Sequence, residues 1–276
     1  MGLGPFLSSS IPGIFLAERE AEMARILKVQ HWKPEFGYND EGFFLRRGDL
    51  TDNLLLFAGE KPPDPRLYDL AIVYGGYMSA YDEAGNPWIA DELRFLEGCL
   101  KADTPVFGIC LGSQLLARLL GARVFRSSAP EFGFKKVLLN EAGATDPVLG
   151  AIGDTRGSFL AIQWHDDAWD LPAGSELLAS SETWPNQAFR YGPHVLAIQF
   201  HLEFTQPHMA WAVARPGESE SEDPGKEDST AFAAPSPRYD EIRTSMEKVL
   251  SRILAIRDVG AGARSQGAVE LSRTVR

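Results

Sequence analysis

Cys110 stands in the sequence context of a nucleophile. An apolar run of β-branched and aromatic residues precedes it, and leucines at helical spacing follow it. We therefore expect Cys110 at a strand-to-helix turn, where Gly108 and Gly112, two positions to either side, permit a tight turn. The positive N-terminus of the following helix would stabilise a thiolate and present N–H groups to a developing oxyanion.

A base and its orienting group occur together far downstream. Residues 194–204 have the apolar pattern of a strand, and His201 and Glu203, two positions apart, share one face of an extended chain. The Glu203 carboxylate can then hold one imidazole nitrogen while the other takes the proton from Cys110. This is the nucleophile, base and orienter logic of a catalytic triad.

A pair of glycines follows another apolar strand. Residues 70–74 are apolar, and Gly75 and Gly76 come directly after them, where absent side chains expose backbone N–H groups to a ligand. These glycines are a candidate oxyanion site; the alternative is an ordinary loop after a strand.

Simpler structural roles compete with several of these interpretations. A free cysteine is usually a small buried hydrophobic residue, and Cys99, on an amphipathic helix, is expected to be one. His165 with Asp166 and Asp167 would suggest metal ligands, but no second histidine cluster or cysteine pair completes a site. We expect neither a metal nor a cofactor. His31, His194 and His208 show no partner pattern and are expected to be structural or exposed.

Composition bounds the class of protein. The 276 residues, 44% of them hydrophobic, alternate strand-like with helix-like segments, which predicts one α/β domain. The net charge of −11 and the lack of a basic stripe argue against nucleic acid as a partner. Two cysteines, one assigned to catalysis, suggest a reducing, cytoplasmic setting. No apolar run is long enough to indicate a membrane partner.

The predicted domain covers residues 23–257. Residues 1–22 lack signal-peptide features and are expected to be a flexible extension, with Met23 a possible start. The acidic stretch 215–237 is predicted to be a disordered insertion. Apolar residues recur at helical spacing over residues 239–254 and should form a helix that packs on the sheet. Residues 258–276 are expected to be a flexible tail.

Three motifs together resemble a known family. Residues 108–114, 75–79 and 201–203 look like the three signatures of class I glutamine amidotransferases, which carry a Cys-His-Glu triad, and the resemblance extends from about residue 26 to 205. The most similar group is the stand-alone type that resembles the amidotransferase domain of GMP synthase. The resemblance implies a flavodoxin-like three-layer α/β sandwich, with a mainly parallel sheet and an antiparallel addition near residues 134–178.

The resemblance also implies roles for single residues. The family typically has proline where this chain has Tyr77; since proline has no N–H, the oxyanion donor must be the second glycine, Gly76. The N–H of Leu111 would be the other donor. Gln114 and His165 match positions that line or adjoin the substrate pocket in relatives.

The function implied is hydrolysis of the γ-amide of glutamine through a γ-glutamyl thioester on Cys110. An alternative is a γ-glutamyl peptidase acting on γ-glutamyl amides or peptides by the same chemistry. An alternative of another class is a regulatory or binding protein of this fold, although the intact triad argues against it. The residues after Phe204 hold no phosphate-binding loop, so a synthetase that accepts the ammonia is expected to be a separate chain.

Overall fold

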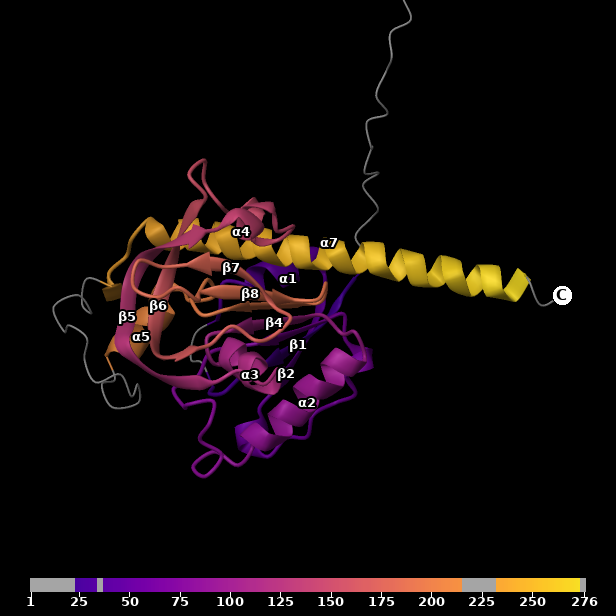
Figure 1. The fold of residues 1–276 in the computed structure, drawn as a ribbon, viewed down its shortest axis with the longest axis horizontal. Coiled ribbons are helices and arrows are strands. Elements are labelled where there is room, and N and C mark those ends of the chain that lie inside the picture. The colour runs from indigo at the N-terminus through magenta and orange to yellow at the C-terminus, as the bar shows by residue number, and fades with distance from the viewer. Residues whose placement is uncertain (1–22, 34–36, 215–231, 274–276) are drawn as a thin grey trace, which may run out of the picture.

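The computed structural model describes residues 23–33, 37–214 and 232–273. Within these residues the chain forms a nine-stranded mixed sheet in the order β2-β1-β3-β4-β9-β8-β7-β5-β6, with helices on both faces (Figure 1). This is the α/β sandwich that the sequence predicts. The predicted extension 1–22 lies outside the described residues, as do positions 215–231 of the predicted insertion.

The parallel strands form one half of the sheet. Apart from the polar edge strand β2, they are short, largely apolar and buried, as expected when helices cover both faces. They are β1 (Arg25–Val29), β2 (Leu50–Leu54), β3 (Leu70–Val73), β4 (Val106–Ile109) and β9 (Val195–Ile198). Because these strands are parallel, their carboxyl ends meet at one edge, where the segments that follow β3, β4 and β9 lie together.

The antiparallel half is larger than the sequence predicts. It starts at Val124 and continues to Tyr191, beyond both ends of the predicted portion, residues 134–178. A register shift between Arg126 and Glu131 interrupts the pairing of its two longest strands. The strands are β5 (Val124–Leu139), β6 (Ser158–Trp169), β7 (Glu176–Ser180) and β8 (Ala188–Tyr191).

The helices divide between the two faces. Helices α2 (Ile89–Lys101) and α3 (Leu111–Leu119) cover one face, whereas α1 (Glu41–Arg47) and α7 (Arg238–Arg273) lie on the other (Figure 1). Successive residues of a strand enter different cores, since Ile26 packs with α7 and Leu27 with α2 and α3. Two further short helices are α4 (Glu141–Thr145) and α5 (Gln206–Val213).

The C-terminal segment corrects two boundaries. The predicted helix packs on the sheet, as the burial of Ile242, Met246 and Leu250 shows. Helix α7 nevertheless continues to Arg273, through most of the predicted tail 258–276. Phe232, inside the predicted insertion 215–237, is buried against Phe134, so the end of that stretch packs on the domain because it carries an aromatic anchor.

Cys99 belongs to the core, as predicted, and burial raises the pKa of its thiol to about 12. Within the part of the chain that the structure describes, no helix is both long and apolar enough to cross a membrane.

Glycines allow α3 to approach the sheet closely. A Cβ atom on Gly112 would lie 2.2 Å from the carbonyl oxygen of Val73 in β3, a distance that no packed atom tolerates. A Cβ on Gly108 would lie 2.8 Å from the carbonyl oxygen of Gly112. Both neighbours are backbone atoms, which cannot turn aside as a side chain can. The turn that carries Cys110 therefore depends on these two positions being glycine.

We expect Gly112→Ala to lower the free energy of unfolding by about 1–3 kcal/mol or more, because the added methyl group overlaps backbone. Gly98→Ala in helix α2 is the matched control: its Cβ would meet only Pro65 Cγ at 3.6 Å, and alanine should stabilise the helix by up to about 1 kcal/mol. Urea titration of both variants measures this. Equal stability of the two variants would contradict the packing argument.

Candidate active site

Cys110 occupies the turn between β4 and α3 in a strained backbone conformation. Its φ of 50° and ψ of −107° lie where side-chain-bearing residues are rare. The turn is fixed from both sides, because the Cys110 N–H donates to the Ile198 carbonyl at 2.8 Å and the Ser113 hydroxyl donates to the Cys110 carbonyl at 2.7 Å. The thiol is thereby directed into a cavity at the carboxyl edge of the sheet.

His201 and Glu203 meet at this edge. Strand β9 ends at Ile198, and His201 then forms an isolated bridge with Ile162 of β6. His201 Nδ1 donates to Glu203 Oε1 at 2.6 Å, and the N–H of Leu202 donates to the other carboxylate oxygen at 3.0 Å. The carboxylate therefore fixes which imidazole nitrogen faces the thiol.

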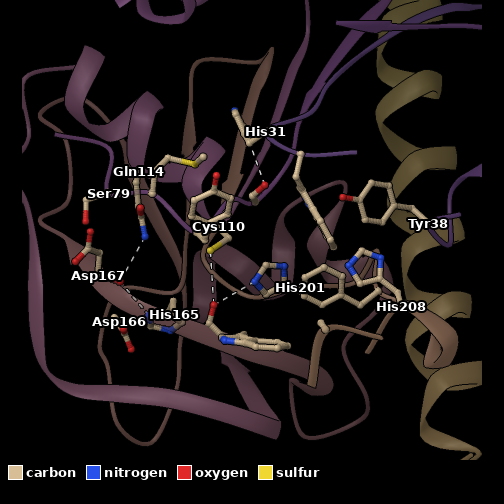
Figure 2. Close-up of a pocket in the computed structure, with 18 of the residues that line it drawn as sticks. His31, Tyr38, Ser79, Cys110, Gln114, His165, Asp166, Asp167, His201 and His208 are labelled. Carbon is tan, nitrogen blue, oxygen red and sulfur yellow. Dashed lines mark hydrogen bonds between the residues drawn. The ribbon is translucent and has the colours of Figure 1, made fainter. Parts of the chain in front are cut away.

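The other imidazole nitrogen and the thiol converge on one carbonyl group. His201 Nε2 lies 3.4 Å, and Cys110 Sγ 3.8 Å, from the carbonyl oxygen of Trp164 (Figure 2). The amide of Gln199 lies 3.7 Å from the same sulfur. The structure thus brings together the three residues predicted as a triad, in an order suited to moving a proton between sulfur and imidazole.

The environment of His201 favours its charged form. Burial opposes the imidazolium, but the negative charges of Glu203 and Cys110, and hydrogen bonds to both, outweigh burial and raise the pKa of His201 from 6.5 to about 10. The imidazolium is therefore the favoured form of His201 at neutral pH. An imidazolium beside Cys110 can donate a proton to a leaving amine.

Two further residues hold the segment that carries the histidine. The ring of Phe204 stacks on His201, with centroids 4.2 Å apart. Asn39 holds the backbone of this segment. Its side-chain amide donates to the carbonyl groups of Leu202 and Phe204 at 2.8 and 2.9 Å. Its backbone N–H donates to the carbonyl group of Glu203 at 2.8 Å. These contacts fix the direction of the imidazole.

Gly75 and Gly76 follow β3 and lie against the reaction centre. A Cβ on Gly75 would be 2.9 Å from His201 Cε1 and 3.4 Å from Cys110 Cβ, and a Cβ on Gly76 would be 2.9 Å from Leu111 Cδ2. Leu111 is the first residue of α3, so its N–H has no partner within the helix. The two predicted oxyanion donors, Gly76 and Leu111, therefore lie beside each other and beside Cys110.

The two residues predicted to line the pocket do so. Gln114 Nε2 lies 3.4 Å from Gln199 Oε1 and 3.5 Å from the Asp167 carbonyl oxygen. His165 Nδ1 donates to the same carbonyl at 3.0 Å, and its Nε2 lies 3.3 Å from a carboxylate oxygen of buried Glu131. Both side chains thus have polar contacts at the cavity wall.

The cavity measures about 690 Å³ and has two chemically different ends. Figure 2 shows Ser79, Gln114 and His165 to one side of Cys110, and His201 and His208 to the other. The first end is polar and also includes the side chains of Asp166, Asp167 and Arg126, whereas the second is aromatic, formed by Trp32, Tyr38, Phe204, His208 and Trp211. Cys110 lies between the two ends.

His208 contributes an uncharged surface to the aromatic end. Its ring stacks on Tyr38, with centroids 5.1 Å apart, and also contacts Phe204 and Trp32. Burial, and to a lesser extent the charge of His201, lower the pKa of His208 to about 3. The imidazole is therefore neutral at physiological pH and acts as one more aromatic ring.

Several residues that shape the site were not singled out by the sequence patterns. Asn39 and Gln199 belong to no recognised motif. His31 shows no partner pattern in the sequence and was expected to be structural or exposed; in the structure it pairs with buried Glu92. One signal was present: Glu92 interrupts the apolar stripe of its helix, three residues after Ile89. Among the residues described, no three or more His, Cys, Asp or Glu side chains gather as they would around a metal ion.

Comparison with known proteins identifies relatives of this chain. The family model described as glutamine amidotransferase class-I matches residues 60–211. A crystal structure of a glutamine amidotransferase from Thermotoga maritima superposes with a TM-score of 0.73 at 30% sequence identity, covering 84% of this chain and 99% of that one. The fold is thus that of this family.

Curated relatives carry three different names. The glutamine amidotransferase-like protein YfeJ of Salmonella typhimurium is 33% identical, over 63% of this chain and 75% of its own length. Gamma-glutamyl peptidase 3 of Arabidopsis thaliana is 29% identical, over 59% and 66%. A glutamine-hydrolysing GMP synthase subunit of Sulfurisphaera tokodaii is 33% identical, over 55% and 76%. The relationship to GMP synthase amidotransferase chains agrees with the sequence motifs.

We expect the His201 ring to keep its proton well above pH 8, because its pKa is raised to about 10. The stabilisation from this proton is complete below pH 6.5 and is lost as the pH rises through the folded-state pKa. Glu203→Gln removes the largest favourable charge and should shift the titration to lower pH. NMR of the ring Cε1–H measures this, with Glu97→Gln as control; titration near 6.5 in the wild type would contradict it.

Proposed function

The chain belongs to the class I glutamine amidotransferase family, and from this premise we propose that it hydrolyses the γ-amide of glutamine through a γ-glutamyl thioester on Cys110. The observation that supports this most is the buried array of Cys110, His201 and Glu203 beside the two backbone donors. Related chains are typically cysteine hydrolases.

The first half of the reaction would form the thioester. The Cys110 thiolate attacks the γ-carbonyl carbon, a C–S bond forms, and the carbonyl electron pair moves onto oxygen. The N–H groups of Gly76 and Leu111 stabilise this oxyanion. The His201 imidazolium then donates its Nε2 proton to the amide nitrogen, the C–N bond breaks, and ammonia leaves.

The second half would release glutamate. Neutral His201 takes a proton from water while the water oxygen attacks the thioester carbonyl, and the same donors hold the second oxyanion. The C–S bond then breaks, which restores the thiolate beside the imidazolium. Glu203 keeps Nδ1 protonated throughout, so Nε2 alone exchanges protons with the substrate.

The polar end of the cavity suits the glutamyl head group. The carboxylates of Asp166 and Asp167 can face an α-ammonium group, and Arg126 can pair with an α-carboxylate. Gln114 and His165 would line this end as substrate-binding residues. The γ-carbonyl would then reach Cys110, because the polar end adjoins the nucleophile.

A second candidate function is hydrolysis of larger γ-glutamyl amides or peptides. The observation that favours it is the aromatic end of the cavity, which lies beyond Cys110. The NH2 group of glutamine is too small to fill this space, whereas a larger leaving amine could occupy it. A relative named gamma-glutamyl peptidase adds support. The thioester chemistry would be the same, and only the amine released would differ.

If free glutamine is the substrate, the ammonia requires an acceptor. One relative is named as a single subunit of GMP synthase, and such a name implies that another chain completes the enzyme. We propose that a separate synthetase chain would receive the ammonia. A regulatory protein of this fold without turnover is the alternative of another class, and retention of all three triad residues argues against it.

We expect purified protein to release ammonia from glutamine and Cys110→Ala to lose this activity entirely, because alanine offers no nucleophile. The thermal unfolding midpoint should change little, since the side chain is small. A coupled glutamate dehydrogenase assay and calorimetry measure the two quantities. Full activity in a pure Cys110→Ala sample would refute the mechanism.

The released amine separates the two candidate functions. We expect γ-glutamyl-phenylalanine to be cleaved with a higher kcat/KM than glutamine if the aromatic end binds the leaving group. Trp211→Ala should then lower that kcat/KM about tenfold while sparing glutamine, a loss of the size expected for an aromatic contact. Equal sensitivity of both substrates would argue against the peptidase. No turnover of any γ-glutamyl compound would favour the regulatory protein.

A further inference from the structure

We propose that His31 and Glu92 are positioning residues that orient the peptide bond between Gly75 and Gly76, called here the 75–76 peptide, so that its N–H faces the oxyanion. This inference rests on the proposed function, because it assigns a task within the same reaction. The two residues lie outside the triad and come from distant parts of the chain.

The contacts form a continuous chain from helix α2 to the glycine loop. Glu92 of α2 accepts from His31 Nε2, with both carboxylate oxygens 3.0 Å away. His31 Nδ1 lies 3.1 Å from the carbonyl oxygen of Gly75 and donates to it (Figure 2). His31 is 2% exposed and Glu92 is fully buried, so water does not compete for these bonds.

The ring of His31 must donate from both nitrogens. Each nitrogen faces an oxygen acceptor, one a carbonyl and one a carboxylate, and only the imidazolium carries two N–H groups. Burial disfavours that charge, but Glu92 and the backbone carbonyls outweigh burial and raise the pKa of His31. Trp88 stacks on the ring, with centroids 5.3 Å apart, and limits its rotation.

Holding the Gly75 carbonyl also fixes the Gly76 N–H. The carbonyl of Gly75 and the N–H of Gly76 belong to one peptide unit. The peptide bonds of the described chain are trans, so this carbonyl and this N–H point in opposite directions. The carbonyl is turned toward His31. His201 Cε1 and Cys110 Cβ lie within 3.4 Å of a Cβ placed on Gly75, so this loop also borders the reaction centre. A carbonyl held by His31 leaves the Gly76 N–H on the other side of the peptide, where it is available to the oxyanion.

A glycine pair needs such an external restraint. Neither Gly75 nor Gly76 has a side chain that limits rotation, so the 75–76 peptide could turn its carbonyl toward the oxyanion instead. That orientation would replace a donor with a repelling acceptor. A charged donor held in a dry site strongly favours the productive orientation, because hydrogen bonds from ionised donors are the stronger ones.

Two substitutions of His31 separate this role from a purely structural one. The amide of asparagine reaches about the position of Nδ1, so His31→Asn keeps a donor for the Gly75 carbonyl and loses the contact with Glu92. The amide of glutamine reaches about the position of Nε2, so His31→Gln keeps the partner of Glu92 and loses the contact with Gly75. Glu97→Gln, on the exposed face of the same helix, is the control.

We expect kcat to fall by about 10- to 100-fold in His31→Gln, toward the loss of one oxyanion donor, and by clearly less in His31→Asn. KM and the rate of Cys110 alkylation by iodoacetamide should stay near wild type, since displacement of iodide builds no oxyanion. Glu92→Gln should lower kcat less than His31→Gln, because an acceptor for Nε2 remains. Glu97→Gln should change nothing.

The opposite order, with His31→Asn slower than His31→Gln, would overturn the proposal and leave His31 as a partner that merely neutralises Glu92. If the wild type cleaves no γ-glutamyl compound, the proposed function fails, but the inference is still decided by the crystal structure of His31→Gln. A 75–76 peptide turned over in that structure would support it. A wild-type orientation would overturn it.

Discussion

The close approach of helix α3 to the carboxyl ends of β3 and β4 is the constraint on which the site depends. It brings the Gly112 Cα so close to the Val73 carbonyl that no side chain fits, and the Gly112 N–H donates to the Tyr74 carbonyl at 3.2 Å. Because the helix begins this near the sheet, Cys110 must turn within a single residue and takes a strained φ. The same approach places the N–H of Leu111 beside the glycine loop after β3, so nucleophile and oxyanion donors are consequences of one packing contact.

Buried charge is balanced in pairs at this edge of the sheet. A lone buried carboxylate would be strongly unfavourable, whereas a carboxylate with a cation and hydrogen bonds is tolerated. Three buried acids near the site have such a partner: Glu203 pairs with His201, Glu92 with His31, and Asp40 with Lys28. The first two pairs serve the proposed reaction, because His201 would transfer protons and His31 holds the Gly75 carbonyl. The third pair contacts Tyr38 and Tyr74, because the Lys28 ammonium lies over both of their stacked rings, and Tyr38 belongs to the aromatic end of the cavity.

The sequence was most informative where function is encoded over a few residues. The turn at Cys110, the spacing of His201 and Glu203, and the paired glycines each require only local geometry, and the structure brings all of them together. The features that could not be predicted from the sequence depend on contacts between distant segments. Glu92 is 61 positions from His31, and an acid within an apolar stripe has no meaning until its partner is known. The antiparallel strands extend further than predicted, and a register shift between Arg126 and Glu131 interrupts their regular pairing. Helix α7 extends to Arg273, beyond the predicted end of the domain.

Chemistry and specificity have different structural origins in this domain. The triad and the oxyanion donors follow the ends of parallel strands, where sheet geometry leaves them little freedom. The aromatic end of the cavity instead comes from Trp32 and Tyr38 after β1 and from His208 and Trp211 on helix α5, which no strand pairing restrains. Substitutions there can change the amine that is accommodated without moving Cys110. Under the proposed function, the lining of the aromatic end, rather than the triad, would therefore decide which amine the chain releases.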